Sequence, residues 1–242
     1  MIQTIDFAPL DGITKVVFRQ VWSRYFGGVD RYFIPFFSPT PHHTMTPRDL
    51  REVDFAHNAN LPSVPQVMTK NAGDFLWACA VLRDMGYTEV NLNLGCPSGT
   101  VTAKGKGSGF LAHPEELAAF FDTVFARNPL PVSVKTRLGY ETPEEFHALL
   151  EIYNRYPIAC LTIHGPVHLD AFADALAASH NPVCYNGDLR TVEDVHALVG
   201  RFPIVSHVMI GRGLVADPAL ARKLRGGAGV TRKELSEFLA AL

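Results

Sequence analysis

Short apolar runs alternate with amphipathic helical patterns along almost the whole chain. The apolar runs have the length of buried parallel strands and lie at 3–8, 31–36, 64–68, 89–94, 131–136, 159–163, 182–185 and 207–210. Helical periodicity occurs between them, at 14–25, 73–85, 114–127, 143–155, 169–179, 191–199 and 216–224. Eight strands with intervening helices predict an α/β fold, a closed (β/α)8 TIM barrel, with a doubly wound open sheet as the alternative.

Cap signals support several of these helices, and one segment lacks any clear period. Thr142-Pro143-Glu144-Glu145 and Thr191-Val192-Glu193-Asp194 each combine a cap residue with acidic residues in the first turn. The segment 38–59 is rich in Pro, His and Thr. We therefore predict a long loop over the barrel mouth there, which leaves room for short irregular structure within it.

The last residues of the chain have the pattern of a second unit. Gly226-Gly227-Ala228-Gly229 predicts a linker, and Thr231 then begins a capped helix that reaches Leu242. We expect a barrel domain at 1–225 and, at 226–242, a linker and the first helix of a C-terminal helical domain that this chain does not complete. A helix of three turns is marginally stable unless it packs against something.

Composition excludes several classes of protein. With 242 residues, 47% hydrophobic residues, 19% charged residues and a net charge of −2, the chain has no overall charge that would attract nucleic acid. Contact with RNA would need local basic patches. The four cysteines show neither metal-ligand spacing nor a disulfide framework. No leader or spanning segment is evident, so we expect a cytoplasmic protein without a metal or a membrane partner.

The run Asn91-Leu92-Asn93-Leu94-Gly95-Cys96-Pro97-Ser98 is the most informative stretch. It places two carboxamides and a thiol at the C-terminal end of a predicted strand, where barrel enzymes assemble their active sites. The alternative interpretation is an ordinary strand end, with Cys96 as a small buried apolar residue.

Other predicted strands also end in residues suited to a shared site. An amide within an apolar strand needs a partner, a lysine at the mouth suits an anion, and loops after strands seven and eight commonly bind phosphate. Each feature has an ordinary structural explanation when taken alone. The residues are Pro9-Leu10-Asp11-Gly12, Gln66, Lys135, His164, Asn186-Gly187-Asp188 and Gly211-Arg212-Gly213.

Together with the Gly-Cys-Pro run, these residues resemble the tRNA-dihydrouridine synthases in order and rough spacing, over residues 5–224. The resemblance implies a TIM barrel followed by a helical tRNA-binding domain, FMN as cofactor, NADPH as electron donor and uridine in tRNA as substrate. It assigns cofactor contacts to Pro9, Leu10, Asp11, Gln66, Lys135, His164, Asn186, Gly187, Asp188, Gly211 and Arg212.

The resemblance also implies how the substrate is handled. Hydride passes from the flavin to C6 of the uracil, Cys96 protonates C5 as a general acid, and Asn93 helps to hold the base. We expect Lys104 and Lys106, in a glycine-rich run, and Arg137 to contact tRNA phosphates. The run could equally be a solvated loop without this function.

The chain departs from the family pattern after His164. A His-x-Arg element is usual there, whereas here Gly165-Pro166 leads almost directly to Leu169 without an arginine. Either a loop is missing from the chain, or RNA contact and activity are weakened at this edge. Two alternatives remain open: a flavin-dependent dehydrogenase of a free pyrimidine such as dihydroorotate, and a tRNA-binding relative without catalysis. We expect a monomer.

Overall fold

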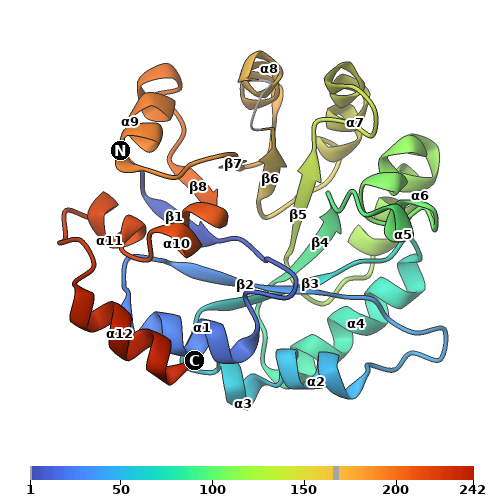
Figure 1. Ribbon diagram of the computed structural model, residues 1–242. Coiled ribbons are helices and arrows are strands. Elements are labelled where there is room, and N and C mark those ends of the chain that lie inside the picture. The colour runs from blue at the N-terminus through green and yellow to red at the C-terminus, as the bar shows by residue number, and fades with distance from the viewer. Residues whose placement is uncertain (1, 166–168) are drawn as a thin grey trace.

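The computed structural model describes residues 2–165 and 169–242 and places eight parallel strands in a closed barrel surrounded by helices (Figure 1). Each strand pairs with the next one along the chain, and β8 closes the sheet by pairing with β1. The predicted TIM barrel is therefore confirmed. The strands are β1 (Thr4–Phe7), β2 (Arg31–Phe37), β3 (Ser63–Val67), β4 (Val90–Leu94), β5 (Val132–Arg137), β6 (Leu161–His164), β7 (Val183–Asn186) and β8 (His207–Ile210).

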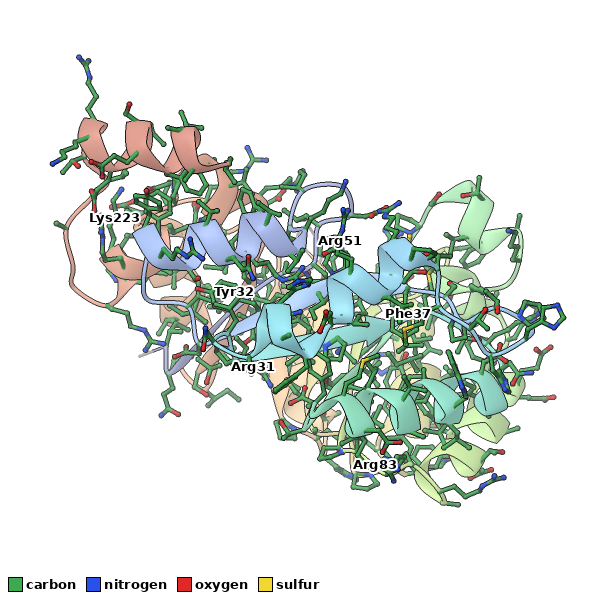
Figure 2. All side chains as sticks on the ribbon, turned by 90° about the horizontal axis from the view of Figure 1, so that it is seen from below. Arg31, Tyr32, Phe37, Arg51, Arg83 and Lys223 are labelled. Atoms are coloured by element: carbon green, nitrogen blue, oxygen red, sulfur yellow. The ribbon has the colours of Figure 1, made fainter. Side chains whose placement is uncertain are left out.

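Because all strands run in the same direction, the barrel has two chemically distinct ends. Arg31 and Phe37 lie at opposite ends of β2 (Figure 2). We call the end where strands begin the floor and the end where they finish the mouth. Residues such as Leu92 and Val134 are fully buried between barrel and helices, which explains the continuous apolar runs in the sequence.

The helices return the chain from the mouth to the floor and cover the outside of the sheet. No helix within the described ranges combines the length and apolar character needed to cross a bilayer. The helices are α1 (Val16–Tyr25), α2 (Pro47–Val53), α3 (Phe55–Asn58), α4 (Ala72–Met85), α5 (Gly99–Thr102), η1 (Gly107–Ala112), α6 (Pro114–Phe125), η2 (Pro143–Glu145), α7 (Phe146–Tyr153), α8 (Leu169–Ala178), α9 (Val192–Arg201), α10 (Arg212–Ala216), α11 (Leu220–Leu224) and α12 (Arg232–Ala241), where η denotes a 3-10 helix.

The prediction of a long loop over 38–59 is right for 38–46 and wrong for the remainder, where α2 and α3 form. Thr46 and Asp49 form a reciprocal capping box around Pro47, which starts α2 without a long periodic pattern. Buried Arg19 of α1 then binds Glu52 at 3.2 Å and Asn58 at 3.0 Å. The two short helices are held by this polar cluster, which hydrophobic periodicity does not reveal.

The predicted single helix over 216–224 is also wrong. The structure has two short helices, α10 and α11, separated at Asp217 and Pro218. Proline has no N–H to continue the helix, and the side chain of Asp217 accepts a hydrogen bond from the N–H of Ala219 at 3.2 Å. The break ends α10 at Ala216, and α10 itself begins at Arg212, directly after β8 at the mouth.

The predicted C-terminal helix is present as α12, and it packs alongside α1 (Figures 1 and 2). Its Phe238 is buried, with its ring centroid 4.9 Å from that of Phe26 and close to Phe18 and Tyr25. Glu234 pairs with Arg222 at 2.9 Å. These contacts give the short helix the support it needs, and the further helical domain remains a prediction.

We expect Phe238→Ala to release α12 from the barrel, because large-to-small changes at buried aromatic positions cost about 3–5 kcal/mol. Trypsin cleavage at Arg232 and Lys233 should become much faster. Leu239→Ala is the matched control, since that side chain is 61% exposed. Equal cleavage rates for the two variants would show that Phe238 does not hold the helix.

Candidate functional site

A cavity of about 440 Å³ opens at the mouth of the barrel, within the usual range of about 300–1,000 Å³ for ligand sites. Residues at or after the ends of all eight strands line it. The structure therefore brings together most of the predicted site: Pro9, Leu10, Asp11, Gln66, Asn93, Cys96, Lys135, Arg137, His164, Asn186, Gly187, Asp188, Gly211 and Arg212. Lys104 and Lys106 are not among the lining residues.

Cys96 is presented to this cavity by a backbone that is fixed on both sides. The Asn93 side-chain oxygen accepts hydrogen bonds from the N–H groups of Gly95 and Cys96, each at 3.0 Å. The Cys96 carbonyl accepts from the N–H and hydroxyl of Ser108, at 3.0 and 3.1 Å. The other three cysteines are buried, whereas Cys96 is partly exposed.

The glycine-rich run after Cys96 forms a tight turn between two short helices. Residues 103–106 connect α5 to η1, and Gly107 and Gly109 are buried. A Cβ at Gly107 would lie 2.7 Å from the Cys96 carbonyl oxygen, so the glycine permits a close approach of two backbones. Lys104 is exposed and Lys106 half-buried on this packed segment.

Gln66 lines the cavity, yet the protein itself supplies its hydrogen-bond partners. Its Nε2 donates to the Oδ1 of Asn91 and its Oε1 accepts from the Nδ2 of Asn93, both at 2.7 Å. The partners that an amide in an apolar strand needs therefore come from the protein, and the contact of Gln66 with a cofactor stays a prediction. Gln66 and Asn91 are fully buried, so their side-chain amide groups are held in place before any ligand binds.

The cavity carries an excess of positive charge. Lys135, Arg137, Arg190 and Arg212 line it, against two carboxylates, Asp11 and Asp188. Asp188 pairs with Arg212, and Asp11 pairs with Arg48 at 3.1 Å at the rim. Among the described residues, no carboxylate forms an ion pair with Lys135 or Arg137. The net positive charge favours an anionic ligand.

Two titratable groups report this environment. Burial lowers the pKa of Lys135 to about 8. The nearby Cys184 acts against this shift, and the charge of Arg137 adds to it. Burial, together with the charges of Lys135 and Arg137, lowers the pKa of His164 to about 4. At neutral pH the imidazole of His164 is therefore uncharged, while most of Lys135 carries its proton.

Several residues that line the cavity were not predicted from the sequence, notably Pro35, Phe36 and Arg190. The pairing of β2 with β3 is irregular between Ile34 and Phe37, where Pro35 cannot donate to the ladder. A proline inside an apolar strand is a signal for such a bulge. Arg190 lies two residues after the predicted Asn186-Gly187-Asp188 turn, and its positive charge at that place could have indicated that it belongs to the site. The departure from the family pattern after His164 concerns residues 166–168, which lie outside the described residues.

A second cluster of titratable groups lies toward the floor and does not line this cavity. Asp6, Cys184 and His207 have potential metal-ligand atoms within 4.8 Å of one another. However, Asp6 accepts two hydrogen bonds from Arg31, at 2.9 and 2.8 Å, and one from His207 at 2.7 Å. The Asp6 carboxylate is already matched by cationic donors, which disfavours a metal ion there.

Known proteins resemble this chain in sequence and in fold. A family model described as dihydrouridine synthase matches residues 6–238. A probable tRNA-dihydrouridine synthase of Staphylococcus epidermidis is 30% identical over 226 residues, covering 87% of this chain and 68% of the relative. One from Staphylococcus aureus is 30% identical, covering 96% and 74%. The solved structure of morphinone reductase aligns with a TM-score of 0.64 at 12% identity, covering 98% of this chain and 89% of that chain, which shows a shared fold.

We expect the imidazole of His164 to remain neutral down to about pH 4 in the ligand-free protein, as followed by NMR titration of its ring proton. Because the pKa is lowered in the folded state, stability should be lost as pH falls from about 6.5 through about 4. Lys135→Gln removes one of the responsible charges and should raise this pKa. Arg190→Gln is the control and should have a smaller effect. A pKa near 6.5 in the unaltered protein would contradict the positive field.

Proposed function

The chain belongs to the dihydrouridine synthase family, and we propose that it reduces specific uridines in tRNA to dihydrouridine as a flavin-dependent oxidoreductase. The observation that carries the proposal is the position of Cys96, whose backbone is fixed at the edge of a positively charged cavity. This arrangement places a thiol beside a site for an anionic ligand.

The chemistry of the cavity lining supports FMN as the cofactor. Apolar residues such as Ala8 and Phe36 suit a planar ring, while the cationic side chains suit a phosphate and an electron-rich ring edge. Lys135, without an ion-pair partner in the described structure, is suited to an anionic part of the ligand. Arg212 and Arg190, after β8 and β7, stand at the usual phosphate position of barrel enzymes.

The cofactor, reduced by NADPH, would supply hydride to C6 of the uracil. Cys96 holds the proton that is delivered to C5, and the fixed Asn93–Cys96 turn determines where its sulfur lies. The second N–H of Asn93 is left to contact the base, because its first donates to Gln66. The positive charge of Lys135 stabilises negative charge that develops nearby.

A tRNA would be held by cations around the mouth. Within the described part of the chain, no ion pair involves Lys70, Lys104 or Lys106. Lys70 lies close to Gly105, which separates Lys104 from Lys106 in the sequence. Arg137 extends this group into the cavity. Because the whole chain has a net charge of −2, such a local cluster must provide most of the attraction.

The purified protein should be yellow from bound FMN, and Cys96→Ala should remain yellow. NADPH should still bleach the flavin in this variant, while dihydrouridine formation, measured by mass spectrometry of tRNA, falls by about 10²–10⁴-fold. The selective loss follows because the thiol acts only in the proton transfer to uracil. Cys79→Ala, at a buried position of α4, is the control. Equal loss of both half-reactions would remove Cys96 from this role.

Replacing Lys104 and Lys106 with Gln should weaken tRNA binding and flatten its dependence on salt, by about 0.7–0.9 in logarithmic slope for each phosphate that the protein no longer neutralises. Filter binding across a salt series measures both quantities. Arg83→Gln, at the end of α4 near the floor, should leave them unchanged. If free uridine is reduced as fast as tRNA, the substrate is a small pyrimidine instead.

A further inference from the structure

A chain of hydrogen bonds crosses the interior of the barrel and begins at the floor. Glu89, just before β4, accepts from the hydroxyl of Ser133 on β5 at 2.6 Å. The same hydroxyl oxygen accepts from the Nδ2 of Asn91 at 2.9 Å. Asn91 and Ser133 are fully buried, and neither they nor Glu89 line the cavity.

The chain continues to the mouth through the amides already described. The Oδ1 of Asn91 accepts from Gln66, the Oε1 of Gln66 accepts from Asn93, and the Oδ1 of Asn93 accepts from the N–H of Cys96. We call the five side chains the amide relay: Glu89, Ser133, Asn91, Gln66 and Asn93. It joins the floor of the barrel to the thiol-bearing turn without a break.

The two ends of the relay require the same orientation of every group between them. An ionised carboxylate can only accept hydrogen bonds, so Ser133 must donate to Glu89 and its oxygen must accept from an amide nitrogen. A backbone N–H can only donate, so Asn93 must turn its oxygen toward Cys96. Working inward from either end assigns the same oxygen and nitrogen positions to Asn91, Gln66 and Asn93.

The floor end is itself anchored. Arg31 donates to the second oxygen of Glu89 at 3.0 Å, which leaves the first oxygen for Ser133. Because the middle of the relay is buried, a reversed amide would leave polar atoms without partners, which is unfavourable. The relay therefore has one stable arrangement.

We propose that Glu89, Asn91 and Ser133 are positioning residues that fix the amide orientation of Gln66 and Asn93 and, through them, the placement of Cys96. Their effect on catalysis rests on the proposed function, whereas their effect on the Cys96 turn does not. None of the three touches the cavity, so they act on ligand and thiol only through the relay.

The reactivity of Cys96 toward iodoacetamide in the cofactor-free protein tests the proposal directly. The other three cysteines are buried, so labelling of the folded protein reports on Cys96. Ser133→Ala breaks the relay between Glu89 and Asn91 and should speed alkylation by about tenfold, which corresponds to about 1.4 kcal/mol. Glu89→Gln should act in the same direction, because Arg31 will take the amide oxygen and the NH₂ will then face Ser133.

Two controls separate this role from general loosening. Ser63→Ala alters another barrel serine, whose buried hydroxyl has no hydrogen-bond partner, and should leave the rate unchanged. Ser133→Thr keeps the hydroxyl and should restore the slow rate. Mass spectrometry must show one labelled thiol per chain, which excludes global unfolding.

Unchanged rates in both Ser133→Ala and Glu89→Gln, or an equal rise in Ser63→Ala, would overturn the proposal. In the FMN-loaded protein, the first two variants should also shift the absorbance spectrum of the flavin, because Gln66 lines its site. If the protein binds no flavin, the proposed function fails, while the alkylation rates still decide the role of the relay.

Discussion

The pairing of β8 with β1 is the interaction on which the site depends. It joins Thr4–Phe7 to His207–Ile210 and converts a row of strands into a ring. Only then do the ends of β1 and β8 lie across from those of β4 and β5, around one cavity. Residues separated by more than two hundred positions thus line the same cavity. The site is a consequence of closure, and no single loop contains it.

Closure also creates an interior in which polar groups must be satisfied within the barrel. The protein solves this differently at its two ends. Near the floor, Asp6 and Glu89 form ion pairs with Arg31, and Asp6 also pairs with His207. Near the mouth, Gln66 and Asn93 use amide hydrogen bonds, which hold groups in place without adding charge. The cations of the cavity are left less neutralised than those at the floor, which is the condition for binding an anion.

The sequence predicted the barrel and most of the residues that line its mouth cavity because both follow local rules. Strands and helices have different periods, and parallel strand ends converge at one mouth. The features that the sequence did not predict depend on contacts between residues far apart in the chain. The partners of Gln66 come from β4, and α2 and α3 depend on Arg19 of α1. Phe36 lines the cavity because the pairing of β2 with β3 is irregular beside Pro35. A proline within an apolar run indicates such an irregularity.

The positive cavity has an energetic consequence for the whole molecule. Burying Lys135 away from carboxylates is unfavourable to the folded state, as its lowered pKa shows. The neutral state of His164 limits this cost, since a second buried cation would add repulsion. An anionic ligand reverses both effects, because it raises the two pKa values and stabilises the charged lysine. Binding of an anion in the cavity would therefore be coupled to the stability of the fold through the same side chains.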